Sequence, residues 1–454
     1  MIVSTNPATL QENGRFPLSD AAAVEHVLDG AVRAQRSWRE TSPDERAQLL
    51  RNIAIALRED SGNLSRLITE EMGKPIAEAE GEIAKCAMTC DFYADNAVRF
   101  LSPEYVQTSA AESMIVGDPL GVVLAIMPWN YPFWQTIRCL APALLGGNAL
   151  VLKHANNVVQ CAMWTASVLE RAGAPSGLLG VLYLGNEEVE RVIRDRRIAA
   201  VSLTGSTRVG SIVGAQAASE LKPQVLELGG SDPYIVLADA DVDLAAEVAA
   251  KARFSNAGQS CLSPKRFIVV REIADRFVER LLGHVAALRL GDPMERDTTL
   301  GPLARADLRD ELDHQVKATI AAGATLLTGG GPADRTGHFY HPTVLDHVTE
   351  DMVAFREETF GPVGSVVRAR DADDAIRLAN RSDFGLGASI WTRDLDAARH
   401  HVRRIEAGAV FVNAMVASDP RVPFGGIKRS GYGRELGLLG VRSFMNVKTV
   451  WIAA

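Results

Sequence analysis

The sequence predicts an α/β protein built from two doubly wound, mostly parallel sheet domains. Two observations predict this fold class. From residue 121 onward, short apolar runs alternate with stretches of helical periodicity, which is the pattern of parallel strands joined by crossover helices. The chain of 454 residues is also long enough for about three domain-sized units, and its 47% of hydrophobic residues can form large cores.

The first hundred residues are predicted to be helical. The segment 42–45, SPDE, is a capping box with proline at the first helical position. It opens an amphipathic helix that is predicted to continue as far as 73–75. A second helix is predicted over 77–100.

Two sets of buried strands are predicted after this helical region, with a domain boundary at the glycine pair 229–230. The first set is GVVLAIM (121–127), ALVLK (149–153), LLGVLYL (178–184), AAVSLTG (199–205) and QVLELGG (224–230). The second set is PYIVLAD (233–239), RFIVV (266–270), GSVVRAR (364–370), GASIWT (387–392) and GAVFVN (408–413). The apolar, β-prone tail 445–454 is expected to pair with another subunit or domain, because an uncovered edge strand aggregates.

Composition and charge argue against several classes of function. The net charge of −8 and the absence of a basic block argue against a nucleic-acid partner. No residue between Asp118 and Arg138 is charged, but Pro128 and Pro132 interrupt this run, so we expect no membrane span. The five cysteines are scattered and lack paired metal-ligand spacing, and residues 1–16 lack signal-peptide features. We therefore expect a cytoplasmic protein without a metal site.

Cys261 is the first candidate for a catalytic residue. It follows FSNAGQS (254–260), and small polar residues with glycine predict a turn that presents the thiol to a cleft. The alternative is a buried cysteine that acts as a small hydrophobic residue.

Glu227 and Asn130 are the other two catalytic candidates. Glu227 stands in an apolar strand, where burial would raise its pKa toward the range of a general base; a solvent-facing strand glutamate is the alternative. Asn130 lies in the turn PWNYP (128–132), where its amide could donate to a developing oxyanion. A simple helix-capping role is the alternative.

A nucleotide site is predicted where an apolar strand runs into Gly205 and Gly210 at the start of a helix. The pattern is weak, because it lacks the GxGxxG fingerprint and an ordinary βα turn would look the same. Lys153 stands at the C-terminal end of another predicted strand, where open α/β sheets bind ligands.

With these residues assembled, the sequence resembles the NAD(P)-dependent aldehyde dehydrogenase superfamily over essentially its whole length. The motifs that carry the resemblance are EMGKP (71–75), PWNYP (128–132), LKHA (152–155), LTGST (203–207), LELGG (226–230), FSNAGQSC (254–261), EETFGP (357–362) and PFGG (423–426). Their order and spacing also match.

This resemblance implies an aldehyde dehydrogenase-like fold with a small β extension for oligomerisation. The implied division is a Rossmann-like cofactor-binding domain over 1–105 and 122–228, a catalytic domain over 229–418, and oligomerisation segments at 106–121 and 434–454.

The resemblance also implies catalytic roles. Cys261 would attack the aldehyde, and the Asn130 amide with the backbone N–H of Cys261 would hold the oxyanion. After hydride transfer to the nicotinamide, Glu227 would activate the water that hydrolyses the thioester. Because members that pass the acyl group to coenzyme A lack this glutamate, a free acid is the expected product.

Cofactor contacts are implied at eight positions: Trp129, Lys153, Asn156, Gly205, Ser206, Gly210, Glu358 and Phe360. Some members carry an acidic residue where this chain has Asn156, and that residue would repel a 2′-phosphate. Both NAD and NADP are therefore expected to be accepted. Ser263 occupies the place of a second cysteine in relatives that form a redox disulfide, so no such switch is expected.

Substrate contacts are expected at Trp134, Arg138 and Ser418. Trp134 and Arg138 are one helical turn apart, and a guanidinium in an apolar tunnel calls for an anionic partner. WQTIR and VASDPRVPFGG (416–426) resemble the short bacterial succinate-semialdehyde dehydrogenases, in which the matching serine and arginine hold the distal carboxylate. Pairing of Arg138 with a protein carboxylate is the alternative.

The expected function is oxidation of succinate semialdehyde to succinate with NAD(P)⁺ through a cysteine thioester. A broader aliphatic or glutarate semialdehyde dehydrogenase is the alternative within the family. A catalytically silent nucleotide-binding protein and a cofactor-independent thiol hydrolase are alternatives from other classes. The expected partner is a small aldehyde with a distal carboxylate, and a homodimer or homotetramer is the expected assembly.

Overall fold

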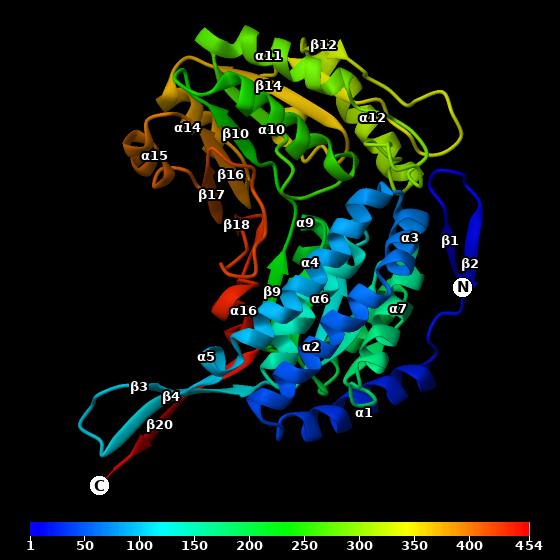
Figure 1. The fold of residues 1–454 in the computed structure, drawn as a ribbon, viewed down its shortest axis with the longest axis vertical. Helices are drawn as coiled ribbons and strands as arrows, with labels where there is room; N and C mark the ends of the chain where they lie inside the picture. Colours follow the sequence, from blue (N-terminus) through cyan, green and yellow to red (C-terminus); the bar gives the residue numbers. More distant parts are fainter. Residues whose placement is uncertain (454) are drawn as a thin grey trace.

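The structure, a computed structural model, describes residues 1–453 apart from the side chain of Asn186. Figure 1 shows two α/β bodies and a β arm that projects from one of them. We name them the six-stranded body and the seven-stranded body after their main sheets. The predicted α/β class with two mostly parallel sheets is confirmed.

The six-stranded body has the strand order β19-β9-β8-β5-β6-β7. Its strands are β5 (Val122–Met127), β6 (Ala149–His154), β7 (Leu179–Val181), β8 (Ile198–Thr204), β9 (Gln224–Glu227) and β19 (Gly431–Tyr432). Neighbouring strands from β5 to β9 pair in parallel, and only β19 is antiparallel. Its helices are α1 (Ala21–Trp38), α2 (Pro43–Glu59), α3 (Ser61–Met72), α4 (Ile76–Asp95), α5 (Ala97–Leu101), α6 (Pro132–Leu145), α7 (Val159–Arg171), α8 (Asn186–Arg194) and α9 (Thr207–Ser219).

The seven-stranded body has the strand order β12-β13-β14-β11-β10-β16-β17, parallel except for the edge strand β12. Its strands are β10 (Pro233–Val236), β11 (Arg266–Val270), β12 (Thr325–Thr328), β13 (Thr343–Asp346), β14 (Val363–Ala369), β16 (Gly387–Trp391) and β17 (Ala409–Val412). Its helices are α10 (Val242–Phe254), α11 (Arg271–Ala286), α12 (Ala306–Ala321), α13 (Val353–Arg356), α14 (Ala372–Asn380) and α15 (Leu395–Val402).

Shorter elements complete the fold. They are β1 (Ile2–Thr5) paired with β2 (Glu12–Phe16), β15 (Phe384–Gly385) paired with β18 (Ile427–Lys428), the 3-10 turns η1 (Asn156–Val158) and η2 (Ser255–Gly258), and α16 (Gly437–Arg442). Among the described residues, no helix is long and apolar enough to cross a membrane.

Every strand of the two sheets except β19 lies within a predicted domain range. The strands of the seven-stranded sheet all lie within 229–418, and those of the six-stranded sheet lie within 122–228 except β19. Each sheet belongs to a separate hydrophobic core. The domain borders themselves stay a prediction.

Two predicted helices are divided in the structure. The capping box is present, since the Glu45 backbone N–H donates to Ser42 Oγ and the Ser42 N–H donates to Glu45 Oε2 at 2.7 Å. The helix that it opens ends at Glu59, however, and α3 begins after Asp60, whose backbone leaves the helical region. Aspartate, serine and glycine at this point have low helix propensity, which favours the break. The helix predicted over 77–100 is similarly divided into α4 and α5.

The C-terminal tail forms part of the β arm. β20 (Met445–Ile452) pairs antiparallel with β4 (Glu112–Pro119), whose other edge pairs with β3 (Glu104–Tyr105). One edge of β20 is therefore paired within the chain, with the other strand of the predicted oligomerisation segments, and not with another subunit or domain as expected. The other edge has no strand partner in the described part of the chain, and Trp451 of this strand is exposed. Pairing there with another subunit stays a prediction.

Candidate active site

Cys261 lies just beyond a tight turn that follows α10. In η2 (Ser255–Gly258), Asn256 and Ala257 adopt left-handed φ values of 52° and 51°. Residues with a Cβ keep such values only where their surroundings hold them. Asn256 provides this support, because its Nδ2 donates to the carbonyl of Asn130 at 3.0 Å. The predicted turn before the thiol is therefore present.

The Cys261 thiol is half-buried, whereas the other four cysteines are buried. It lines a cavity, so the packing-only alternative does not describe it. Burial raises the pKa of this thiol to about 11, although the positive charges of Lys265 and Arg138 oppose the shift. The thiol is therefore protonated at neutral pH and must lose its proton when it reacts.

Asn130 is fastened to the loop that leads to the thiol. Its Nδ2 donates to the carbonyl of Gln259 at 3.1 Å, and its Oδ1 is buried without a partner. The residue at the N-cap of α6 is Tyr131, not Asn130, and the first N–H groups of that helix donate to the Glu82 carboxylate. The helix-capping alternative for Asn130 is therefore wrong, and its amide is positioned relative to Cys261.

Glu227 is the last residue of β9 and is only 2% exposed, so the solvent-facing alternative is wrong. Both of its carboxyl oxygens are buried without a hydrogen-bond partner. Burial raises its pKa well above the ordinary value, and the nearby charge of Glu435 adds to this shift, while Arg138 and Arg434 oppose it. Burial therefore favours the protonated form of this carboxyl group in the ligand-free site.

Glu358 is placed against the glycine pair that follows β9. Its Oε1 accepts a hydrogen bond from the Gly230 N–H at 3.0 Å and lies 3.4 Å from Lys265 Nζ. A Cβ at Gly229 would come within 2.3 Å of Glu358 Oε2, so a larger residue there would displace this carboxylate. The glycines of LELGG thus allow this carboxylate to reach the strand end.

Lys153 lies near the end of β6, at the carboxyl edge of the parallel sheet. Burial lowers the pKa of its ammonium group. Its Nζ is 3.4 Å from the side-chain oxygen of Asn156, which begins η1 and is exposed. A cation and a neutral amide therefore stand together at the edge where open sheets bind ligands.

The turn after β8 leads into α9. Ser206 is the N-cap of α9, and its Oγ accepts from the Val209 N–H at 3.3 Å. The Gly205 N–H donates to the Glu227 carbonyl, which joins this turn to the end of β9. A Cβ at Gly210 would overlap the Leu228 side chain at 2.3 Å. Gly210 therefore allows α9 to pack closely against Leu228, and its contact with a pyrophosphate stays a prediction.

Trp129 and Phe360 form an aromatic pair across the two bodies. Their ring centroids are 5.8 Å apart and the rings meet edge to face. Two of the predicted cofactor contacts are thus in contact with each other.

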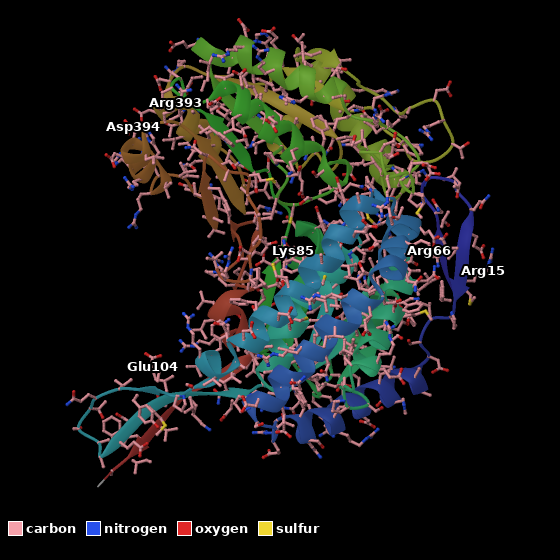
Figure 2. The ribbon with its side chains drawn as sticks, viewed as in Figure 1. Arg15, Arg66, Lys85, Glu104, Arg393 and Asp394 are labelled. Carbon is pink, nitrogen blue, oxygen red and sulfur yellow. The ribbon has the colours of Figure 1, made fainter. Side chains whose placement is uncertain are left out.

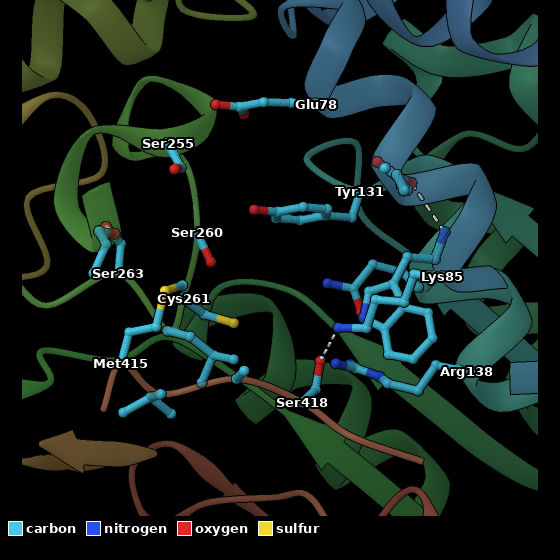
Figure 3. A pocket seen from close by; sticks show the side chains of 18 residues that line it. Glu78, Lys85, Tyr131, Arg138, Ser255, Ser260, Cys261, Ser263, Met415 and Ser418 are labelled. Carbon is cyan, nitrogen blue, oxygen red and sulfur yellow. Dashed lines mark hydrogen bonds between the residues drawn. The ribbon is translucent and has the colours of Figure 1, made fainter. Parts of the chain in front are cut away.

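A cavity of about 300 Å³ lies beside Cys261, between the two bodies (Figure 3). Its lining includes all three predicted substrate residues, Trp134, Arg138 and Ser418. Glu227 is not one of the residues that line it. The structure thus brings the nucleophile and the substrate candidates into one space.

Arg138 is committed to protein partners at this site. Its Nε forms an ion pair with the carboxylate of Glu435, and both side chains are only 2% exposed. Its Nη2 donates to Thr204 Oγ1 at 3.1 Å, and the guanidinium lies 4.8 Å from the ring centroid of Phe424. The alternative that Arg138 pairs with a protein carboxylate is therefore observed, and its contact with a substrate carboxylate stays a prediction.

Sequence reasoning missed three charged residues of this region: Lys85, Lys265 and Glu435. The spacing of Glu78, Glu82 and Lys85 on a predicted helix places all three on one face, a signal that could have identified Lys85. No sequence pattern marks Lys265, whose Nζ donates to the Cys261 carbonyl at 2.7 Å.

Among the described residues, no group of three or more potential ligands could hold a metal ion.

Comparisons with known proteins agree with this geometry. The Aldehyde dehydrogenase family matches residues 1–450. The NAD(P)⁺ succinate semialdehyde dehydrogenase of Escherichia coli (strain K12) is 49% identical over 449 residues, which are 99% of this chain and 97% of that protein. An NADP⁺ succinate-semialdehyde dehydrogenase of Mycobacterium tuberculosis (strain H37Rv) is 46% identical, with full coverage of both chains.

A solved structure agrees as well. The succinic semialdehyde dehydrogenase of Streptococcus pyogenes, solved in complex with NADP⁺, superposes with a TM-score of 0.98 at 37% identity and full coverage of both chains. The match along the whole sequence and the shared fold lead to one conclusion: this chain belongs to the aldehyde dehydrogenase family.

Proposed function

We propose that this protein oxidises succinate semialdehyde to succinate with NAD⁺ or NADP⁺, through a thioester on Cys261. The observation that carries the proposal is the cavity in which Cys261 faces Trp134, Arg138 and Ser418. Relatives that match this chain along its whole length are succinate semialdehyde dehydrogenases named for NAD(P)⁺ or NADP⁺.

In the first half of the reaction, the Cys261 thiol loses its proton to water, and the thiolate Sγ adds to the aldehyde carbon, so that the carbonyl oxygen becomes an oxyanion. The Asn130 amide and the backbone N–H of Cys261 donate to that oxyanion. Asn130 is fastened to the Gln259 carbonyl, so its amide needs little reorganisation before the reaction. Cleavage of the C–H bond then leaves an acyl thioester on Cys261, because NAD(P)⁺ supplies a hydride acceptor when bound.

In the second half, water attacks the thioester carbon and the Cys261 thiolate leaves. Glu227 takes a proton from this water, which requires that Glu227 first loses its own proton. Its raised pKa makes the carboxylate a strong base once it is formed. When the proton taken by Glu227 is passed on to the Cys261 thiolate, the products are a carboxylic acid and the free thiol.

The residues at the carboxyl edge of the six-stranded sheet fit a dinucleotide. Lys153 and Asn156 would hold the adenosine ribose or a 2′-phosphate, since neither is acidic. The N-terminus of α9, a helix of 13 residues capped by Ser206, would face the pyrophosphate. Glu358 would hold the nicotinamide ribose, and Phe360 would pack beside the ring.

The protein is proposed to act as a homo-oligomer in the cytoplasm. The exposed edge of β20 would pair with another copy of the chain. All five cysteines are free, as is usual in a reducing compartment.

The test is a pair of kcat/KM values, for succinate semialdehyde and for butanal, measured from NAD(P)H absorbance with each cofactor. Butanal has the same chain length and lacks the carboxylate. We expect a preference of about 10²-fold or more for the semialdehyde, because butanal leaves charged groups of the cavity unpaired. Near-equal values would reject the proposal in favour of a broader aliphatic aldehyde dehydrogenase.

A further inference from the structure

The charge balance of the cavity indicates that Arg138 is not a sufficient receptor for an anion. Its positive charge is already compensated by Glu435, with which it forms a buried ion pair. A substrate carboxylate that approached Arg138 alone would also approach Glu435, and two carboxylates at one guanidinium repel each other in a poorly solvated site. A second cation is needed to balance the substrate charge.

Lys85 supplies such a cation. It lies on α4 (Figure 2) and lines the same cavity as Cys261. Its Nζ donates to Ser418 Oγ at 2.8 Å and lies 4.1 Å from the ring centroid of Trp134. Figure 3 shows Lys85, Ser418 and Arg138 gathered on one side of the cavity, with Cys261 across from them. The amine thus contacts two of the three predicted substrate residues.

No carboxylate neutralises Lys85 within the described residues, because the acids near it are already engaged. Glu82 forms an ion pair with Lys74 and accepts two backbone hydrogen bonds at the start of α6. Asp419 is held by the guanidinium of Arg421 at 2.6 Å. Lys85 is therefore a half-buried ammonium group with unused donors and no ion-pair partner of its own.

We propose that Lys85 binds the distal carboxylate of the substrate and, together with Ser418, makes the site specific for aldehydes that carry one. With Lys85 included, two cations (Lys85 and Arg138) face two anions (Glu435 and the substrate carboxylate), and the charges balance. This inference deepens the proposed function and rests on it.

The electrostatic surroundings of Lys85 support this role. Burial, together with the positive charge of Arg138, lowers its pKa to about 8, whereas Cys86, Glu82 and Asp419 act in the opposite direction. A carboxylate bound at Nζ would favour the charged form. Free Lys85 loses its proton above about pH 8. The ratio of kcat/KM for the semialdehyde to kcat/KM for butanal should therefore fall above that pH.

The test compares Lys85→Met with the wild-type enzyme, using succinate semialdehyde and butanal with saturating NADP⁺. The methionine keeps most of the side-chain length and removes the charge. We expect kcat/KM for the semialdehyde to fall by roughly 10- to 100-fold, the range for one charge-assisted hydrogen bond, while the value for butanal changes less than about threefold. Lys85→Arg, which keeps the cation, should retain more of the preference than Lys85→Met.

Two further measurements separate binding from a structural role. Succinate should inhibit butanal oxidation by the wild-type enzyme competitively, and Lys85→Met should weaken this inhibition. The matched control is Lys317→Met, because Lys317 on α12 contacts Asp313 on the same helix. This variant should leave kcat/KM unchanged for both substrates. The semialdehyde-to-butanal ratio should decline above pH 8 in the wild type and stay flat in Lys85→Met.

The outcomes distinguish the inference from the proposed function. If the wild type prefers the semialdehyde and Lys85→Met keeps that preference, Lys85 is not the carboxylate ligand, although the proposed function stands. An equal loss for both substrates in Lys85→Met would assign Lys85 a structural role and also overturn the inference. If the wild type itself does not distinguish the two aldehydes, the proposed function and the inference fail together.

Discussion

The Glu227→Gln variant keeps the size of the buried side chain and removes its capacity to accept a proton. Both carboxyl oxygens lack hydrogen-bond partners, so the substitution breaks no hydrogen bond in the ligand-free protein. General bases contribute about 10²- to 10⁴-fold to a rate. We therefore expect steady-state kcat to fall by about that factor through slow hydrolysis of the thioester. The first turnover should still release NAD(P)H in a burst that is stoichiometric with active sites.

Stopped-flow absorbance measures both phases in one experiment. The matched control is Glu247→Gln, an exposed glutamate on α10, which should leave burst and steady state unchanged. A lost burst with normal hydrolysis of the thioester would refute the reasoning, because Glu227 would then act before acylation. An unchanged steady state would refute it as well.

Glu227→Gln should also change how the stability of the protein depends on pH. The folded-state pKa of Glu227 lies well above the ordinary value of 4.5, because burial disfavours the charged form. The folded protein therefore holds a proton that the unfolded chain releases, and its stability decreases by about 1.4 kcal/mol per pH unit from pH 4.5 up to the folded-state pKa. Glu227→Gln removes this penalty. The apparent Tm of the variant should gain on that of the wild type as the pH rises above 4.5, and a constant difference would contradict the pKa shift.

Four other changes have expected outcomes. Cys261→Ala should abolish aldehyde oxidation and leave NADP⁺ binding intact by fluorescence titration; retained turnover would remove Cys261 as the nucleophile. Asn130→Ala should lower kcat by about 10²- to 10³-fold with little change in KM, as for loss of an oxyanion donor, and a rise in KM alone would speak against that role. Alkylation of Cys261 by iodoacetamide in the free enzyme should accelerate about tenfold per pH unit between pH 7 and 10, since the pKa of the thiol is about 11; a plateau near pH 8 would contradict the shift. Deletion of 445–454 should reduce the mass of the assembly in light scattering, and an unchanged mass would reject the oligomerisation role of β20.

Much of the fold follows from local patterns in the sequence. The strands β5, β6, β8 and β9 are apolar runs bounded by glycine or polar residues, and their parallel arrangement follows from the helices between them. The break at Asp60 is less visible, because α2 and α3 together present one continuous amphipathic pattern. The pairing of β20 with β4 could not be predicted, because register between distant strands depends on tertiary contacts.

Part of the active site could likewise be predicted from the sequence, and part could not. Cys261 and Glu227 stand out because a thiol after a polar turn and a carboxylate in an apolar strand are both unusual in sequence. The partners of Arg138 could not be read in this way, since Glu435 is far along the chain and reaches the site only through the fold. Lys85 looks like an ordinary surface lysine of an amphipathic helix until α4 is placed against the cavity.

The most direct test of the thioester account is to trap the acyl-enzyme. Glu227→Gln is mixed with succinate semialdehyde and NADP⁺, quenched in acid within the burst phase, digested and examined by peptide mass spectrometry. The account predicts one succinyl group on the peptide that contains Cys261, lost after treatment with hydroxylamine and absent when NADP⁺ is omitted. An unmodified Cys261 peptide after a full burst of NADPH, or a succinyl group on another residue, would contradict it.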